Sequence, residues 1–250
     1  MAVFLSVIMP AYNEEKNLKR GVLEEVWEYL SKQKYTWEVL IVDDGSTDKT
    51  IKLVENFIKK GRGGFKLIKE KHRGKGGTVI AGMLHAQGDY TLFCDMDQAT
   101  PIFEIEKFLP KFKEGYDVVI ASRSGREGAP IIRKLMAYGF ILLRTIILRL
   151  PYKDTQCGFK AFKMDSAGKI FKRLKVFSES NIISGASVSA GFDLEILYIA
   201  RKLGLKVAEV NVTWSHKDTE RINPIRDSFE GLRDLFRVRI NALLGKYRST

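Results

Sequence analysis

Cysteine is scarce in this chain, which has two among its 250 residues. Cys94 and Cys157 lie far apart, and no cysteine or histidine stands near them at the spacing of metal ligands. The sequence therefore argues against a structural zinc site and against a disulfide framework. A reducing, cytosolic compartment is the default expectation for such a chain.

The sequence also lacks a long uninterrupted apolar run. Its most apolar stretch, Ile131 to Leu150, contains Arg133, Lys134, Arg144 and Arg149. Each such charge would cost about 2.5 to 3.5 kcal/mol at the centre of a bilayer, so we expect no membrane span. Residues Met1 to Pro10 resemble an apolar strand without a basic leader or a cleavage site, so we expect no secretory signal and a cytoplasmic protein.

Proline is rare, with six residues, and neither a Pro/Ser-rich linker nor an internal repeat divides the chain. With 45% hydrophobic residues, the sequence predicts one folded domain over residues 1–250. Lysine and arginine number 42 against 30 acidic residues, a formal net charge of +12. This excess favours an anionic partner: a nucleotide diphosphate, a lipid phosphate, an anionic membrane or a nucleic acid.

Strand and helix patterns alternate along the first half of the sequence. We expect strands at Leu5–Pro10, Glu38–Val42, Phe65–Glu70, Tyr90–Cys94 and Asp117–Ala121, with helices up to Ser31, over Lys49–Lys59 and over Gly76–Ala86. This order predicts an α/β fold with a mostly parallel sheet and helices on both faces. Ligands are then expected at the carboxyl ends of the strands.

One of these strand ends carries paired carboxylates. Residues Leu92 to Cys94 lead directly into Asp95, Met96 and Asp97. Side chains at positions i and i+2 point the same way, so both aspartates can converge on one Mg²⁺ or Mn²⁺ ion. Such an ion can neutralise a leaving diphosphate. Alone the pattern is more typical of a solvated turn or a helix cap.

Two other strand ends are suited to a nucleotide. Tyr12 offers a ring for stacking, and Glu14, Asp43 and Asp44 offer acceptors for base N–H groups. The segment Gly74 to Gly77 could bring backbone N–H groups and Lys75 to phosphates, although glycine clusters are more often turns. Neither a Walker A motif nor a Gly-x-Gly-x-x-Gly fingerprint follows the first strand.

In this order the motifs resemble those of the inverting glycosyltransferases of family 2, which have the GT-A fold. The similarity extends over nearly the whole chain and is greatest to polyprenyl-phosphate sugar synthases, especially the dolichyl-phosphate β-glucosyltransferases. The matching segments are Pro10 to Glu14, Val42 to Ser46 with Asp48 and Thr50, Gly74 to Gly77, Asp95 to Asp97, Ser122 with Arg123, Arg133, Asp154 to Lys160, Gly191 to Glu195, Leu197 to Ala200 and Ala208 to Trp214.

The resemblance implies roles for individual residues. It assigns the nucleotide sugar to Pro10, Tyr12, Glu14, Asp43, Asp44, Lys75, Gly76, Asp95 and Met96. It assigns the metal to Asp95 and Asp97; related mannose transferases have a further glutamine where Ala99 stands here, so we include Gln98 as its candidate replacement. It assigns catalysis to Asp97, Arg123, Arg133 and Asp154. Residues 1–121 would bind the nucleotide sugar, and residues 122–250 the acceptor and the membrane.

The implied reaction is transfer of glucose from UDP-glucose to a polyprenyl phosphate of the dolichyl type, with Mg²⁺ or Mn²⁺. A phosphate monoester has a second pKa of about 6, so it is largely dianionic at neutral pH and needs no general base. GDP-mannose as donor is one alternative. A soluble or polysaccharide acceptor is another, and it would need a base, for which Asp193 and Glu195 are the candidates.

Two further classes are weighed against this interpretation. A metal-dependent nucleotidyltransferase would also need paired aspartates. A nucleic-acid-binding protein would fit the net charge, but the sequence has no interleaved aromatic and basic motif and the acidic strand ends would repel phosphates. We therefore expect no nucleic-acid partner.

A lipid acceptor would require a membrane surface. Ile131–Leu150 and Asn223–Arg248 are amphipathic and basic, so they could lie in the interface at the cytoplasmic face of a membrane as peripheral anchors. The alternative is that both helices cover the sheet as ordinary core helices. Trp214 is more typical of a core residue than of a ligand contact.

Overall fold

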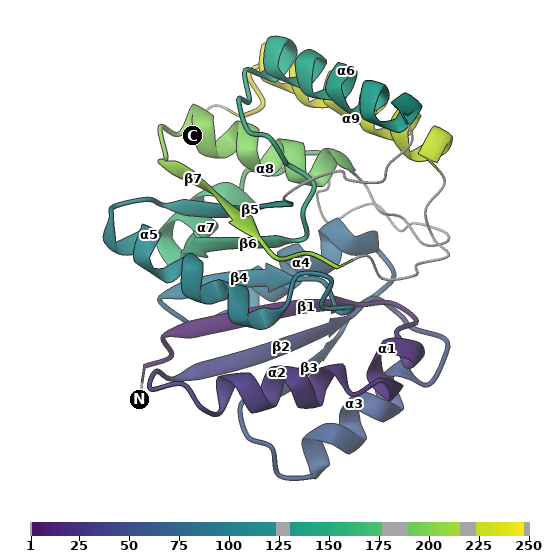
Figure 1. The fold of residues 1–250 in the computed structure, drawn as a ribbon, viewed down its shortest axis with the longest axis vertical. Helices are drawn as coiled ribbons and strands as arrows, with labels where there is room; N and C mark the ends of the chain where they lie inside the picture. Colours follow the sequence, from purple (N-terminus) through teal and green to yellow (C-terminus); the bar gives the residue numbers. More distant parts are fainter. Residues whose placement is uncertain (1, 124–130, 177–189, 216–223, 248–250) are drawn as a thin grey trace.

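The computed structural model describes residues 2–123, 131–176, 190–215 and 224–247 (Figure 1). Within these ranges it gives the backbone alone for 131–137, 190 and 224–228. The chain forms one seven-stranded sheet between layers of helices. The predicted α/β fold with helices on both faces is confirmed.

The sheet has the strand order β3-β2-β1-β4-β6-β5-β7. Its strands are β1 (Leu5–Ala11), β2 (Trp37–Asp43), β3 (Phe65–Lys69), β4 (Tyr90–Cys94), β5 (Val118–Arg123), β6 (Phe159–Lys163) and β7 (Val207–Val212). All pairings are parallel except those of β6, which runs antiparallel to both β4 and β5. The second half of the chain thus contributes a strand to the middle of the sheet.

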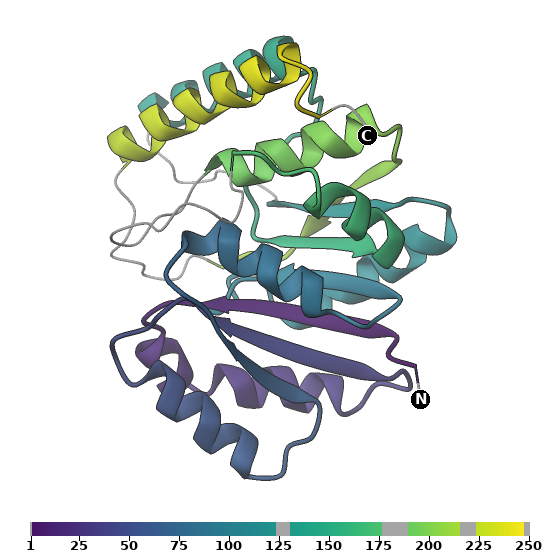
Figure 2. The same ribbon diagram turned by 180° about the vertical axis from the view of Figure 1, so that it is seen from behind.

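Alternating side chains of the strands build a hydrophobic core on each face. One core is covered by α1 (Glu15–Lys19), α2 (Val22–Leu30), α3 (Thr50–Lys59), the 3₁₀ helix η1 (Ile102–Lys107) and α5 (Leu109–Lys113). The other is covered by α4 (Gly74–His85), α7 (Met164–Phe171) and α8 (Ala190–Lys202), as the view from behind shows (Figure 2).

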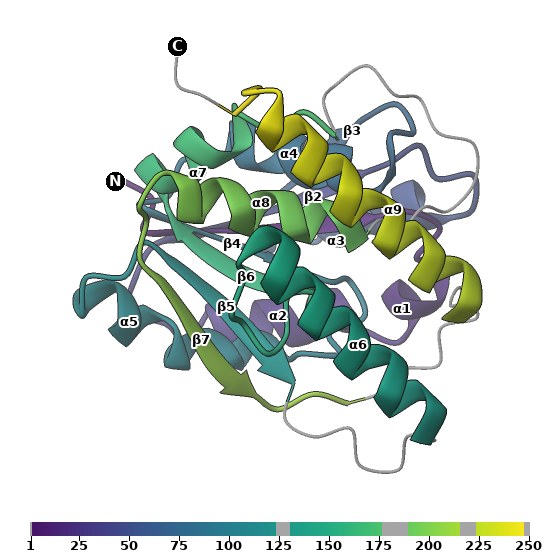
Figure 3. The same cartoon turned by 90° about the horizontal axis from the view of Figure 1, so that it is seen from above.

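Two long helices form an outer layer beyond α8. These are α6 (Ile131–Leu148) and α9 (Pro224–Leu243), which lie side by side with α9 across α8 (Figure 3). They do not lie directly on the sheet, but α9 contributes Leu235 and Val238, and α6 contributes Leu148, to the second hydrophobic core, so the alternative that they are core helices is confirmed in part. In the described ranges, no helix combines the length and the apolar character needed to cross a membrane.

The elements differ from the expected ones in several places, and η1, α5 and α8 are among those not expected. The first helical pattern is split into α1 and α2 at Gly21, whose φ of 91° is left-handed. The α4 helix begins at Gly74, two residues earlier than expected. Strand β6 and helix α7 were not predicted; β6 has only five residues, of which the second and the last are lysines.

The strand ends meet where the sequence predicted a site. Strands β1, β2 and β4 are mutually parallel in the order β2-β1-β4, so Tyr12, Asp43 and Asp95 follow strands that end at one edge of the sheet. Because β6 is antiparallel, its first residue Phe159 pairs with Cys94 at that same edge.

Candidate functional site

The loops after β1 and β2 are locked together by hydrogen bonds. Asn13 has a left-handed φ of 53°, and its Oδ1 accepts hydrogen bonds from the backbone N–H groups of Thr47 (2.8 Å) and Asp48 (3.4 Å). Its own N–H donates to Ser46 Oγ at 2.9 Å, and the N–H of Glu14 donates to Thr50 Oγ1 at 2.7 Å. Ser46 thus joins two loops. These bonds fix the positions of the residues predicted to hold a nucleotide.

Asp43 ends β2 and is 1% exposed. Its Oδ2 accepts hydrogen bonds from the N–H groups of Gly45 and Ser46, both at 3.0 Å. Its Oδ1 is buried and has no hydrogen-bond partner in the described part of the chain. A buried carboxylate oxygen without a partner is costly, and a ligand N–H group would satisfy it.

Asp44 and Tyr12 are joined through a residue that the sequence analysis missed. His72 Nδ1 lies 2.8 Å from Asp44 Oδ2, and the His72 ring stacks on Tyr12 with centroids 4.3 Å apart. Asp44 Oδ1 also accepts a hydrogen bond from the N–H of Arg73 at 2.7 Å. His72 follows β3 as an isolated histidine, so its position beside Tyr12 is visible only once the strand order is known.

Asp95 and Asp97 follow β4, and Asp95 is held from two sides. Lys75 Nζ, on the first turn of α4, lies 2.5 Å from Asp95 Oδ1. The Asp95 N–H donates to the Gly158 carbonyl at 3.1 Å, and a Cβ at Gly158 would come within 2.0 Å of Asp95 Oδ2. The Asp95 carboxylate can occupy its place only because residue 158 is glycine.

Asp97 lies in a partly buried position close to another negative charge. Burial and the nearby charge of Asp95 raise the pKa of Asp97 above its usual value. Its Oδ1 accepts a hydrogen bond from the N–H of Ala99 at 2.9 Å, and its carbonyl accepts one from Arg20 at 2.6 Å. A cation would favour the ionised form of both aspartates.

The residues present are suited to a divalent ion that a ligand completes. Among the described residues no group of three or more His, Cys, Asp or Glu side chains converges on one point. Mg²⁺ typically keeps several waters and takes one or two carboxylates plus substrate phosphates. Asp95 and Asp97, two residues apart after β4, are the candidates for such a pair of hard oxygen ligands, which would suit Mg²⁺ or Mn²⁺.

Four other residues predicted for the site do not point a side chain toward Asp95 and Asp97. The Gln98 side chain turns inward, and its Nε2 donates to the Asp95 carbonyl at 3.0 Å and lies 3.6 Å from Cys94 Sγ. Met96 packs in the core, and Gly76 is buried within α4. Pro10 remains on β1, next to the loop of Tyr12. A contact of Met96 or Gly76 with a ligand would therefore involve the backbone.

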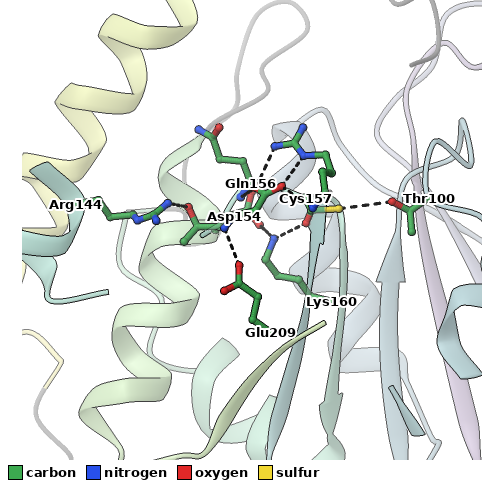
Figure 4. Close-up of polar contacts among 10 residues, drawn as sticks. Thr100, Arg144, Asp154, Gln156, Cys157, Lys160 and Glu209 are labelled. Carbon is green, nitrogen blue, oxygen red and sulfur yellow. Dashed lines mark hydrogen bonds and ion pairs between the residues drawn. The ribbon is translucent and has the colours of Figure 1, made fainter. Parts of the chain in front are cut away.

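The loop before β6 carries Asp154, which holds Arg123 at the end of β5. Arg123 donates to Asp154 through Nε (2.6 Å) and Nη2 (3.0 Å), a bidentate pair. Burial opposes ionisation of Asp154, but the hydrogen bonds and charge of Arg123 outweigh it and lower the pKa of that carboxyl. The Asp154 N–H in turn donates to Glu209 Oε1 at 2.7 Å (Figure 4).

Two buried cations brace the same loop (Figure 4). Arg144 of α6 donates to Thr155 Oγ1 at 2.8 Å and to the Tyr152 carbonyl. Lys160 of β6 donates to the Cys157 carbonyl at 2.6 Å and to Asp193 Oδ1 at 2.6 Å. The sequence analysis treated Arg144 only as a charge that interrupts an apolar run. A cation within an apolar segment was the signal that could have identified it.

The candidate residues from the second half of the chain differ in burial and in their contacts. Glu195 is fully buried and accepts hydrogen bonds from the Lys175 N–H (2.8 Å), the Val176 N–H (2.9 Å) and Tyr247 OH (2.7 Å). Trp214 is 39% exposed and packs against Arg123, with the guanidinium 5.7 Å from the ring centroid, so its interpretation as a core residue is wrong. Arg133 lies in the part of α6 whose side chains are not described.

The strand order, with acidic residues and flanking cations at one edge of the sheet, is typical of an α/β protein that binds its ligand at the carboxyl ends of the strands. Residues 6–171 match the family described as "Glycosyl transferase family 2". The chain belongs to this family, and the predicted resemblance is confirmed.

Relatives align over nearly the whole chain. It is 35% identical over 264 residues to "Dolichyl-phosphate beta-glucosyltransferase" of Dictyostelium discoideum, with 98% of this chain and 77% of the relative covered. It is 32% identical over 262 residues to the human protein of the same name, again with 98% and 77% covered. These relatives agree with the prediction of a glycosyltransferase.

Solved structures share the fold at low sequence identity. Mannosyl-3-phosphoglycerate synthase from Rubrobacter xylanophilus is similar with a TM-score of 0.69 and 17% identity, covering 99% of this chain and 76% of that one. Glucosyl-3-phosphoglycerate synthase from Mycobacterium tuberculosis, in complex with UDP, is similar with a TM-score of 0.65 and 20% identity, covering 95% and 80%. The predicted GT-A fold is confirmed.

Replacing Gly158 with alanine tests the support of Asp95. The new Cβ would collide with the Asp95 carboxylate, so we expect binding of UDP with Mn²⁺ to fall at least about tenfold while the fold persists. Isothermal titration calorimetry measures the affinity, and circular dichroism checks the fold. Gly168→Ala is the matched control, because a Cβ at Gly168 would meet nothing within 4 Å. Equal affinities in both variants would contradict this account.

Replacing Asp154 with asparagine tests the Arg123 pair through stability. The folded pKa of Asp154 is lowered, so its stabilising contribution is present above the unfolded pKa of about 3.9 and is lost as pH falls through the lower folded value. We expect Asp154→Asn to lower the free energy of unfolding by about 3 kcal/mol at pH 7. The difference should shrink below about pH 3.9. Urea titrations at several pH values measure both, and a constant difference would contradict the ion pair.

Proposed function

We propose that this enzyme transfers glucose from UDP-glucose to a dolichyl-type polyprenyl phosphate, releasing UDP and forming a lipid-phosphate glucose. The observation that carries the proposal is identity of 32 to 35% to proteins named dolichyl-phosphate beta-glucosyltransferase over 98% of the chain. The arrangement of acidic and basic residues at the strand ends supports it.

The donor would lie over the ends of β1, β2 and β4. Asp43 offers one free oxygen, which suits the single N3–H donor of uracil. Guanine presents two adjacent donors, N1–H and the exocyclic amine, and would favour a carboxylate with both oxygens free. This supports UDP over GDP. The similar glucosyl-3-phosphoglycerate synthase, solved with UDP, supports the same choice.

A divalent ion on Asp95 and Asp97 would neutralise charge on the leaving diphosphate. Solved structures of the glucosyl-3-phosphoglycerate synthase with Mn²⁺ and UDP-glucose support Mn²⁺ or Mg²⁺. Among this chain's residues, Lys75 would assist on the diphosphate side. Tyr12, Glu14, Asp43 and Asp44 would hold the nucleoside, with the loops of β1 and β2 locked in advance.

The acceptor phosphate would attack the anomeric carbon in a single displacement, so an α-linked donor gives a β product. A dianionic phosphate oxygen requires no base, and the catalytic task is to bring two anions together. Arg123 is suited to this task, because Asp154 and Trp214 fix its guanidinium at the end of β5. Arg133 stays a prediction for the same phosphate.

A specific observation disfavours a hydroxyl acceptor. Such an acceptor needs a general base, and Asp193 and Glu195 were the candidates. Glu195 is committed to two backbone N–H groups and Tyr247. Asp193 is paired at 2.6 Å with Lys160, whose side chain is fully buried. Both carboxylates are thus already committed to partners within the protein.

The acceptor's lipid chain would be reached from the outer layer of α6 and α9. Side chains with more than half of their surface exposed recur on both helices: Tyr138, Leu142, Ile146, Phe229, Ile240 and Leu243. Arg233 and Arg237 of α9 are about half exposed beside them. We infer peripheral attachment of this layer to the cytoplasmic face of a membrane, with the arginines toward lipid phosphates.

A radiolabelled transfer assay tests the reaction. With UDP-glucose, a polyprenyl phosphate in detergent and Mn²⁺, we expect label in the organic phase, and GDP-mannose should give little. Label should disappear with EDTA, and Asp97→Ala should lower the rate by about 10²- to 10³-fold. Absence of lipid-soluble label from a preparation that binds UDP would refute the polyprenyl acceptor.

Vesicle sedimentation tests the membrane surface. We expect the protein to bind vesicles containing anionic lipid at low salt, and the double variant Leu142→Glu/Ile240→Glu to bind at least about tenfold more weakly, because it loses two apolar contacts with the interface. Phe103→Glu is the control, since Phe103 is exposed on η1, on the opposite face of the sheet. Equal loss in the control would count against a specific surface.

A further inference from the structure

Lys75 is paired with Asp95, one of the two aspartates that would hold a divalent ion. Its Nζ lies 2.5 Å from Asp95 Oδ1. Asp193 and Asp97 are also near enough for their charges to stabilise the Lys75 ammonium. The Lys75 ammonium therefore contacts Asp95 directly and is stabilised by the charges of two further carboxylates, Asp97 after β4 and Asp193 on α8.

The geometry leaves Asp95 little choice of partner. Both of its carboxylate oxygens lie against Gly158, where a Cβ would come within 2.0 Å of Oδ2 and 2.5 Å of Oδ1, and Oδ1 is the oxygen that contacts Lys75. A divalent ion binds a carboxylate oxygen at about 2.0 to 2.1 Å. That ion and the ammonium would then be within a few ångströms of each other, where two positive charges repel strongly in a partly buried site.

We propose that Lys75 is a resident counter-cation that holds Asp95 until the donor diphosphate arrives, and that it thereby makes metal and nucleotide binding cooperative. The proposal rests on the nucleotide site of the proposed function. Without nucleotide, the metal must displace an ion pair from Asp95. With nucleotide, the diphosphate offers Lys75 a new partner and adds oxygen ligands for the metal.

The alternative partner for Lys75 within the protein is less favourable. Asp193 is already paired with the buried ammonium of Lys160 at 2.6 Å. A diphosphate brings at least two negative charges without such compensation. When the diphosphate arrives, Lys75 would move its ion pair from Asp95 to the diphosphate. Asp95 Oδ1 would then be free to bind the metal.

Cooperativity of this kind is reciprocal, so it can be measured without turnover. Mn²⁺ binding is followed by electron paramagnetic resonance, with and without UDP, in the wild type and in Lys75→Met. We expect the wild type to bind Mn²⁺ weakly alone and much more tightly with UDP. In Lys75→Met, Mn²⁺ alone should bind at least about tenfold more tightly, and UDP should enhance it far less.

Lys71→Met is the matched control, because it removes the same charge from an exposed position four residues earlier. Its Mn²⁺ affinity should stay close to the wild-type value, and Lys75→Arg, which keeps the charge, should keep the cooperativity. Equal Mn²⁺ affinity of Lys75→Met and the wild type, in proteins that both bind UDP with Mn²⁺, would overturn the inference and leave the proposed function standing. A wild type that binds neither UDP nor Mn²⁺ in any combination would overturn the nucleotide site itself.

Discussion

Because β6 runs antiparallel to β4, the loop that precedes β6 reaches the same edge of the sheet as the loop that follows β4. This one reversal places Gly158 under Asp95 and Asp154 beside Arg123. A parallel strand at this position would have brought its carboxyl end, and the start of α7, to the site. The two groups of candidate site residues meet because β6, a late segment of the chain, is inserted between the earlier strands β4 and β5.

The charges buried around this loop are better explained by positioning than by stability. Replacing a buried ion pair with apolar residues is often neutral or stabilising, so such a pair is weak evidence for a stabilising role. Lys160 nevertheless lies fully buried in the central sheet, with its ammonium shared between Asp193 and the Cys157 carbonyl. Arg144 reaches the same loop from α6. Both cations fix backbone that carries Gly158 and Asp154, and they do so from opposite ends of the loop.

The sequence alone predicted those site residues that come at the end of a single recognisable strand. Apolar strands can be identified from their hydrophobic periodicity and composition. Asp43 ends one such strand, and Asp95 and Asp97 follow another. His72 and Lys160 could not be placed in this way. Their roles depend on which strands are neighbours, and the register of a short strand that contains a buried lysine is decided by long-range packing. The motif of Asp154 to Lys160 was recognised, but its strand was not, because five residues give too little periodicity to separate a strand from a loop.

The distribution of charge, more than its net value, explains how such a site can join two anions. Carboxylates gather at the ends of β2 and β4, where a cation and a nucleotide would meet them, whereas Arg123 and its partner Asp154 lie on the far side at the end of β5. A site lined only with cations would attract the donor diphosphate and the acceptor phosphate equally, so it would not place either one in a particular position. The proposed cation site on the aspartates and Arg123 at the end of β5 would each attract a different anion, so orientation would follow from electrostatics before any bond is formed or broken.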